Sequence, residues 1–132
     1  QNNLVVTADT LVFIKNEILG KPIDREDSIR MLKLLANSSH TVTTSVCFGY
    51  GEKQHSFNVS TKVFFSDLSS QAIDYYIDHY KPFDKAGSYG IQEWIGNIGI
   101  YKIEGSYTNV VGLPMAETYK TLLHLMEKWD IK

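Results

Sequence analysis

The chain has 132 residues and a mass of 15.0 kDa, a size that suits one domain and leaves little room for two. Its 13 Lys and Arg residues against 15 Asp and Glu residues give a net charge of −2, so it lacks the basic surface that binds nucleic acids or anionic membranes. The hydrophobic content of 43% is enough for a buried core, yet no apolar run exceeds four residues, whereas a membrane-spanning helix needs about 20. We therefore expect neither a nucleic-acid partner nor a membrane partner.

Two features bear on the setting of the chain. Its single cysteine, Cys47, cannot form a disulfide within the chain, and no export signal opens the sequence, so we expect a reducing, cytoplasmic location. The chain begins Gln1, Asn2, Asn3 without Met, so we expect it to be part of a longer protein.

The spacing of apolar residues predicts five strands and three helices in one domain. The expected strands are residues 4–7, 11–14 (after a polar break at 8–10), 41–48, 57–65 (a hairpin around a turn at 49–52) and 98–104. The expected helices are residues 25–36 and 70–80, with Asp24 and Ser69 as N-caps, and a third in which Pro114 is the first helical residue. Because strands and helices interleave, we expect an α/β or α+β class, with a mixed β-sheet flanked by helices.

Several residues are assigned structural roles. The apolar stripe of the last helix, Met115 to Trp129, should belong to the core. Cys47 lies in an apolar strand without a cationic neighbour in sequence and should be buried and inert. The histidines have no metal-ligand spacing and are expected on surfaces; they are His40, His55, His79 and His124.

Asp9 and Lys21 are the first candidates for chemistry. A carboxylate at a strand end can hold a divalent cation or accept a proton from water, although such an Asp commonly caps its own backbone. Lys21 stands between Gly20 and Pro22. Its ammonium could meet a phosphate there, although a turn with an exposed lysine is the more common explanation.

Residues 84–92 carry the densest set of candidates. Their small residues would let backbone N–H groups approach an anionic ligand, and Asp84, Lys85 and Gln92 add charge and an amide. The segment matches neither the phosphate-binding P-loop nor the Gly-x-Ser-x-Gly nucleophile motif. It is typical of a functional loop.

Four segments in order resemble the Maf family of nucleoside triphosphate pyrophosphatases, and the resemblance covers essentially the whole chain. They are Ala8-Asp9-Thr10, Gly20-Lys21-Pro22, the run DKAGSYGIQ from Asp84 to Gln92, and the run EGSYTNVVGLP from Glu104 to Pro114. The resemblance implies an α/β fold related to the inosine triphosphatase-like enzymes. Residues 1–132 would form one Maf-like domain, the carboxy-terminal two thirds of the full domain, without its first strand and helix.

The resemblance also implies cleavage of nucleoside triphosphates to the monophosphate and pyrophosphate, with a divalent cation, Mg²⁺ or Mn²⁺. Asp9 matches the family's proton acceptor and would hold the metal, and Lys21 matches a lysine required for activity. Thr10 and Gln92 match positions associated with substrate choice, and Asp84 and Lys85 would join the substrate site. Gln rather than Glu at position 92 is similar to the branch acting on dTTP and UTP, not the branch that prefers 7-methyl-GTP.

The family's amino-terminal Ser-x-Ser-Pro-Arg-Arg loop, whose arginines would bind the triphosphate, does not occur in these 132 residues. Two hypotheses follow. The first is an enzyme that hydrolyses dTTP and UTP, clears non-standard or excess nucleotides and is linked to cell-division arrest. The second is a non-catalytic nucleotide-binding domain that acts in septum formation through a partner. The apolar edge left without the first strand predicts a homodimer or larger aggregates.

Overall fold

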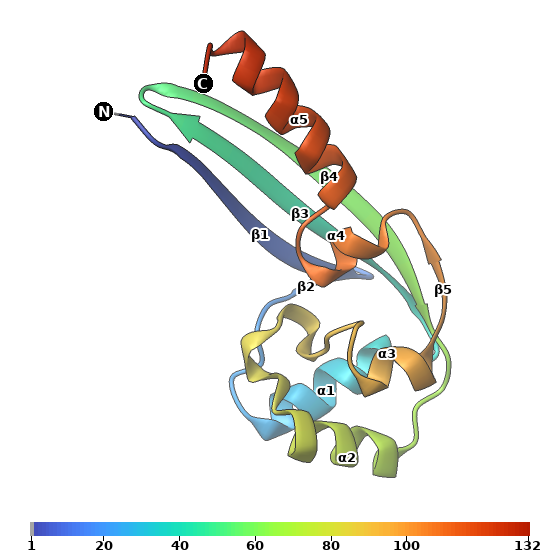
Figure 1. The fold of residues 1–132 in the computed structure, drawn as a ribbon. Coiled ribbons are helices and arrows are strands. Elements are labelled where there is room, and N and C mark those ends of the chain that lie inside the picture. The colour runs from blue at the N-terminus through green and yellow to red at the C-terminus, as the bar shows by residue number, and fades with distance from the viewer. Residues whose placement is uncertain (1) are drawn as a thin grey trace.

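The computed structural model describes residues 2–132 (Figure 1). The strands are β1 (Leu4–Ile14), β2 (Glu17–Leu19), β3 (Ser39–Tyr50), β4 (Lys53–Phe65) and β5 (Ile100–Glu104). The helices are α1 (Arg25–Leu35), α2 (Ser70–Tyr80), α3 (Trp94–Gly99), α4 (Tyr107–Val111) and α5 (Met115–Lys128), with two short 3₁₀ turns, η1 (Pro82–Asp84) and η2 (Ala86–Ser88). Within the described residues, no helix is both long enough and apolar enough to cross a membrane.

The five strands of this part of the chain form one sheet in the order β2-β1-β3-β4-β5. The class of mixed helices and strands is confirmed, but every strand pairing in residues 2–132 is antiparallel, where we expected a mixed sheet. The reason lies in the connections. Short turns join β1 to β2 and β3 to β4, and a short turn can only link strands that run in opposite directions. The longer connections through the helices bring β3 beside β1 and β5 beside β4, and these pairs are antiparallel as well.

β1 is one unbroken strand, so the predicted break at residues 8–10 is wrong. Ala8, Asp9 and Thr10 each pair with a residue of β3, and Thr10 stands opposite Thr44. The polar side chains are tolerated because the backbone ladder with β3 satisfies the main chain whatever the side chains are.

The other edge of β1 is mostly open in the described part of the chain. β2 pairs only with residues 12–14 of β1, which leaves residues 4–11 without a strand neighbour on that side. Three apolar side chains of this segment are exposed: Val5 by 54%, Val6 by 41% and Leu11 by 40%. β1 therefore presents an apolar edge that can accept a further strand.

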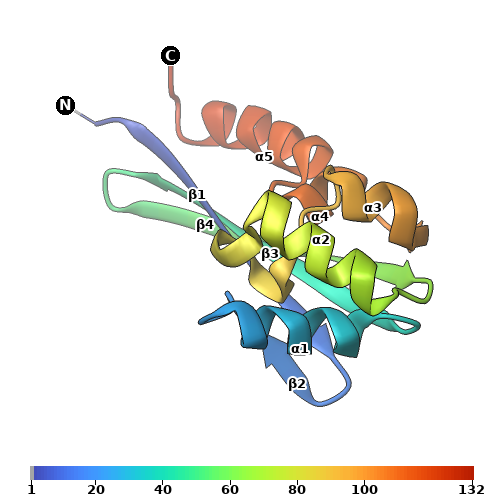
Figure 2. The ribbon, with the colours of Figure 1, turned by 90° about the horizontal axis from the view of Figure 1, so that it is seen from below.

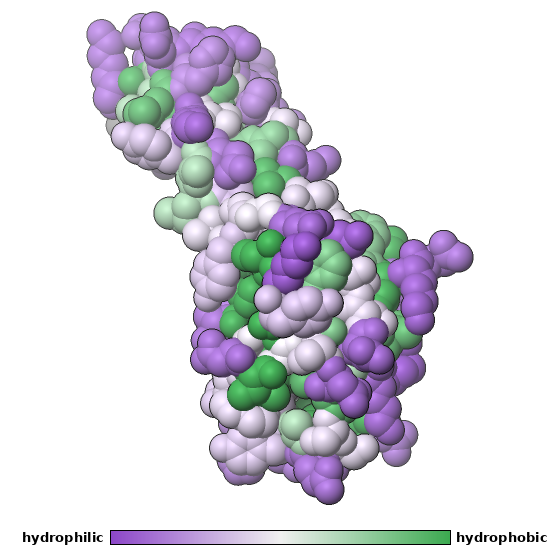
Figure 3. Space-filling model, turned by 90° about the vertical axis from the view of Figure 1, so that its right-hand side faces the viewer, coloured by the Kyte–Doolittle hydropathy of each residue, from purple (hydrophilic) through white to green (hydrophobic). Residues whose placement is uncertain are grey.

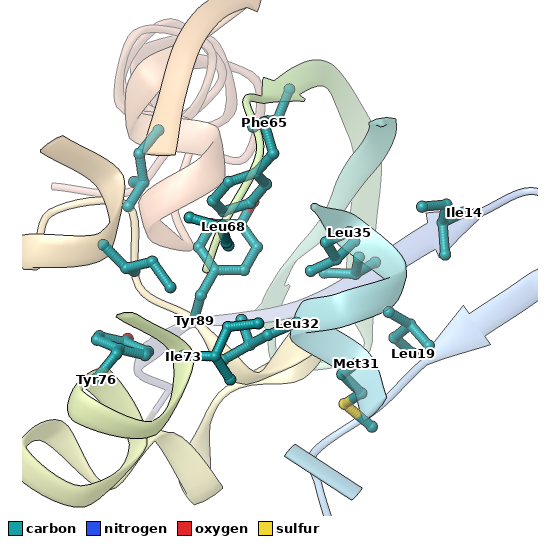
Figure 4. Close-up of a cluster of buried hydrophobic side chains, with 14 of the residues drawn as sticks. Ile14, Leu19, Met31, Leu32, Leu35, Phe65, Leu68, Ile73, Tyr76 and Tyr89 are labelled. Atoms are coloured by element: carbon teal, nitrogen blue, oxygen red, sulfur yellow. The ribbon is translucent and has the colours of Figure 1, made fainter. Parts of the chain in front are cut away.

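Helices cover one face of the sheet, and the apolar residues on that face form two clusters (Figures 1 and 2). At the lower end in Figure 1, β1, β3 and β4 pack against α1, α2 and the segment before α3; Leu32, Ile73 and Tyr76 are among the buried residues labelled in Figure 4. At the upper end, Leu125 and Trp129 pack on the hairpin of β3 and β4.

The helices at 25–36 and 70–80 are confirmed, and so are their caps. The Asp24 carboxylate accepts from the backbone N–H of Asp27 at 2.8 Å, and the Ser69 hydroxyl accepts from Ala72 at 3.0 Å. The hairpin turn is confirmed as well, whereas the last strand begins at Ile100 because residues 98 and 99 still belong to α3. Pro114 is the N-cap of α5 and not its first helical residue.

Three structural expectations are wrong or only half right. His40 is 2% exposed and lies in the core against Phe65 and Tyr89, not on the surface. Cys47 is half-buried rather than buried. The stripe of α5 is core only at its end, since Met115 and Tyr119 are more than half exposed. Exposed apolar side chains also occur on α3, β5 and α4, and Figure 3 shows green patches among the purple on that side of the molecule.

Candidate functional site

All six residues that the sequence analysis singled out line one cavity of about 380 Å³, a volume typical of small-molecule sites. Asp9 and Thr10 come from β1 and Lys21 from the link between β2 and α1. The other three come from the segment between α2 and α3: Asp84 ends η1, Lys85 separates the two 3₁₀ turns, and Gln92 precedes α3. Segments more than 70 residues apart in sequence therefore meet at one place.

β1 contributes five successive residues, 8–12, to the cavity wall. Side chains of a strand alternate between the two faces, so Thr10 shares the helix-covered face with Val12, while Asp9 projects to the other face. The cavity reaches both because this stretch of β1 lies at the sheet's open edge. The open edge thus gives Asp9 and Thr10 access to one ligand.

Two hydrogen bonds fasten the 3₁₀ turn η2 beneath the cavity. The backbone N–H of Gly87 donates to the Gly20 carbonyl at 3.0 Å, which ties the turn to the segment that carries Lys21. The buried hydroxyls of Ser88 and Ser28 bond each other and tie it to α1. Ser88 holds a left-handed φ of 67°, a conformation that costs a non-glycine residue energy and that these contacts stabilise.

Two tyrosines fasten the following residues. The Tyr89 hydroxyl bonds Nε2 of the buried His40 at 2.6 Å. The Gly90 backbone N–H donates to the Tyr76 hydroxyl at 3.1 Å, and that hydroxyl in turn bonds the Glu93 carboxylate. The loop that carries the candidate residues is therefore held on both sides by buried groups, which favours a preformed site.

Gly90 lies where three side chains converge. A Cβ at this position would stand 3.0 Å from Cε of Lys85, 3.1 Å from Oε1 of Glu93 and 3.3 Å from Oε1 of Gln92. A side chain there would displace one of these groups, and Lys85 and Gln92 approach each other over the glycine. Glycine at position 90 thus leaves these side-chain ends where they are, whereas a Cβ would need them to shift slightly.

The charges of the cavity partly neutralise one another. Nζ of Lys85 lies 3.2 Å from Oδ1 of Asp84. The hydrogen bond from Lys85, together with the charge of Lys21, holds the pKa of the Asp84 carboxyl below its usual range. Asp84 is largely exposed, so this ion pair adds little stability; its effect is to keep the ammonium of Lys85 beside the Asp84 carboxylate.

The residues present fit a cation held by one protein carboxylate. No cluster of three or more His, Cys, Asp or Glu side chains with metal-binding geometry occurs in residues 2–132. Asp84 is engaged by Lys85, which leaves Asp9 as the carboxylate of the cavity that no described ion pair occupies. Mg²⁺ is commonly bound by one or two carboxylates together with substrate phosphates and water, and such a site needs no larger protein cluster.

The structure adds residues that the sequence analysis missed. Val42 of β3 and Val110 and Val111 of α4 give the cavity an apolar wall, and Tyr89 supports it. α4 was not predicted because five residues are too few for a helical period, although they stand within the run EGSYTNVVGLP. The cavity thus combines two carboxylates, two lysines, an amide and an apolar wall in a domain of mixed helices and strands, a set of groups that suits a small ligand with an anionic part and an apolar part.

Comparison with known proteins identifies the family. The sequence pattern described as Maf-like protein matches residues 1–125, so the chain belongs to the Maf family. A relative from Flavobacterium psychrophilum named dTTP/UTP pyrophosphatase is 60% identical over 124 residues, which cover 94% of this chain and 64% of the relative. Relatives with the same name from Christiangramia forsetii and Porphyromonas gingivalis are 51% and 50% identical, over 96% and 92% of this chain and 64% and 61% of their own length. The chain thus spans a little under two thirds of these relatives.

Proposed function

We propose that the protein containing these residues hydrolyses dTTP and UTP to the nucleoside monophosphate and pyrophosphate. The observation that carries the proposal is the meeting of Asp9, Thr10, Lys21, Lys85 and Gln92 in one cavity of a Maf-family chain. The relatives' shared name, dTTP/UTP pyrophosphatase, supports the choice of substrates. Since nucleoside triphosphates are cytoplasmic metabolites, we place the activity in the cytoplasm, where it would clear excess or non-standard nucleotides.

Hydrolysis between the α- and β-phosphates needs a proton acceptor for water and positive charge against the phosphoryl oxygens, and in this proposal residues of the cavity contribute both. We assign to Asp9 the role of proton acceptor for the attacking water, whose oxygen forms a bond to the α-phosphorus while the pyrophosphate oxygen leaves. Lys21 and Lys85 oppose the charge of the phosphoryl oxygens. A divalent cation held by Asp9 and the phosphates, which we propose to be Mg²⁺ or Mn²⁺, would neutralise further charge.

Substrate orientation follows from the walls of the cavity. Val42, Val110 and Val111 offer an apolar surface to the flat base, while the lysines stand beside η1. The amide of Gln92 has both a donor and an acceptor, as has the edge of uracil or thymine. Gln92 is exposed, and satisfying loop backbone groups is its alternative role.

The test uses two proteins. One is the 132-residue chain, and the other, called here the extended chain, joins it to the part of the Flavobacterium psychrophilum relative that the match does not cover. Asp9→Asn in the extended chain should lower kcat for dTTP by ~10²–10⁴-fold, the typical contribution of a general base, while nucleotide binding persists. Asp130→Asn removes the same charge after α5, away from the cavity, and should leave kcat unchanged. Wild-type kcat in the Asp9 variant would exclude Asp9, and an extended chain that releases no pyrophosphate from dTTP or UTP would refute the function.

A second function, nucleotide binding without turnover in septum formation through a partner protein, is favoured by one observation. The cavity in residues 2–132 has only two lysines, and both stand near Asp84, so its positive charge is small for a triphosphate. Calorimetric binding of dTTP by both proteins, with no pyrophosphate released by either, would support this second function over the first.

A further inference from the structure

A chain of hydrogen bonds leads from the cavity into the sheet. Oγ1 of Thr10, on the cavity wall, lies 2.9 Å from Oγ1 of Thr44, its cross-strand neighbour on β3. Oγ1 of Thr44 lies 3.1 Å from the backbone carbonyl oxygen of Asn109 in α4. Thr44 and Asn109 are both 0% exposed, so these groups are shielded from bulk water.

The direction of these hydrogen bonds is determined by their chemistry. A carbonyl oxygen can only accept, so Thr44 donates its hydroxyl hydrogen to Asn109. A threonine hydroxyl has one hydrogen, and Thr44 has therefore none left for Thr10. Thr10 must be the donor in the bond between the two hydroxyls.

The acceptor at the end of the chain is itself fixed. Nδ2 of Asn109 donates to the Val42 carbonyl at 3.2 Å and to Oγ1 of Thr61 at 2.9 Å. The Val42 carbonyl cannot donate, which sets the orientation of the Asn109 amide. The Thr61 hydroxyl donates onward to the Ser106 carbonyl at 3.2 Å, so α4 is bound to β3 and β4 on its buried side.

With its hydrogen given to Thr44, Thr10 offers only lone pairs to the cavity. Phosphate oxygens at neutral pH are acceptors as well, and two acceptors do not form a hydrogen bond. A substrate group that forms a hydrogen bond with Thr10 must therefore bring an N–H or O–H. A Cβ at Gly112, which follows Val110 and Val111 at the end of α4, would lie 3.9 Å from Oγ1 of Thr10, so this hydroxyl stands beside the apolar wall of the cavity.

We propose that Thr44 is a positioning residue for substrate choice: it holds the Thr10 hydroxyl as an acceptor for the N3–H of uracil and thymine. Cytosine has a lone pair at N3 and no hydrogen, so it would meet an acceptor with an acceptor. The inference rests on the proposed function. It assigns the rejection of cytosine nucleotides to Thr44, a residue that does not line the cavity.

The test compares kcat/KM for UTP and CTP in the extended chain. Thr44→Val keeps the shape but removes the acceptor, so the Thr10 hydroxyl can rotate and donate to N3 of cytosine. We expect the ratio of kcat/KM for UTP over CTP to fall by about tenfold or more, since a site that hydrogen-bonds its substrate rejects an unpaired analogue strongly. Thr44→Ser, which retains the hydroxyl, should keep the wild-type ratio.

Two further variants show whether Thr44 acts through Thr10. Thr10→Val should also lower the ratio, and adding Thr44→Val to it should change the ratio no further. A purely structural role for Thr44 would lower both kcat/KM values together and leave the ratio unchanged, which overturns the inference. The inference also fails if Thr44→Val lowers the ratio equally with and without Thr10. Loss of UTP hydrolysis in the unmodified extended chain refutes the proposed function instead, so the two failures are distinguishable.

Discussion

The burial of His40 predicts a loss of stability in mild acid. The imidazole is 2% exposed, its Nε2 bonds the Tyr89 hydroxyl, and its Nδ1 has no hydrogen-bond partner in residues 2–132. Protonation would place a charge and a second N–H donor in the core beside the ring of Phe65. Desolvation by burial accordingly lowers the pKa of His40 to about 4.

The size of the effect follows from proton linkage. In the unfolded chain the pKa of a histidine is about 6.5, so between that value and about 4 the unfolded state binds more protons than the folded state. Above a pH of about 6.5 the full free energy of unfolding is present, because the imidazole is neutral in both states. Part of it is lost progressively as the pH falls toward about 4, the pKa of His40 in the folded state. From pH 8 to pH 5 the free energy of unfolding should drop by about 2 kcal/mol through His40 alone.

The assay is urea unfolding of the extended chain at both pH values, for the wild type and for His40→Gln. Glutamine retains a polar group that can bond the Tyr89 hydroxyl, but it does not fill the space of the packed imidazole ring, so the variant should be less stable at pH 8. Because glutamine does not titrate, the variant should lose about 2 kcal/mol less than the wild type on acidification. His55→Gln removes an exposed imidazole and serves as the matched control, with the wild-type pH dependence. An equal loss in the wild type and in His40→Gln would refute the reasoning.

Three other predictions concern the loop, α3 and the open edge. Gln92→Glu removes the donor of the amide, so kcat/KM for dTTP and UTP should fall relative to 7-methyl-GTP by roughly 10²-fold; an unchanged ratio would exclude base recognition by Gln92. Gly96→Ala would set a Cβ 1.9 Å from the Ile91 carbonyl oxygen and should cost about 2–4 kcal/mol in urea unfolding, whereas Gly49→Ala, with no atom within 4 Å, should cost little. The 132-residue chain should form dimers or larger species in light scattering through β1, and Val6→Lys should reduce this association; a monodisperse wild-type monomer at high concentration contradicts the prediction.

The elements with strong periodicity could be predicted from the sequence, and the exceptions have physical causes. Asp24 and Ser69 indicated where two helices begin, because an N-cap hydrogen bond joins a side-chain oxygen to a backbone N–H only three residues further along the chain. The continuity of β1 through Asp9 was not predictable locally, since it depends on pairing with a strand more than 30 residues away. His40 was misplaced for the same reason: its burial comes from Tyr89, 49 residues later in the chain.

The site divides in a similar way. Five of the six residues could be selected because they carry charge or an amide, Thr10 was selected through the resemblance to the Maf family, and the cavity brings all six together. The roles assigned to Asp9, Lys21 and the metal stay predictions. The sequence did not indicate the buried residues that hold the cavity wall in place, such as Ser28, which bonds Ser88, and Thr44, which bonds the Asn109 carbonyl. Such a hydroxyl cannot be told from any other in a strand or helix until its partner is known.

The polar residues behind the site also explain how the covered face of the sheet is organised. Thr10 of β1 stands opposite Thr44 of β3, and Thr61 of β4 lies diagonally from Thr44, opposite Val42. The three threonines lie between the two apolar clusters, and Asn109 of α4 bonds Thr44 and Thr61. Polar groups in such a place cost stability unless they are bonded. Here each hydroxyl and amide hydrogen of the four side chains has an acceptor, whereas Oδ1 of Asn109 has no hydrogen-bond partner in residues 2–132. An apolar core could form without these polar residues. What their hydrogen bonds add is a fixed direction for the Thr10 hydroxyl, which donates to Thr44 at the open edge of β1 and turns its lone pairs to the cavity.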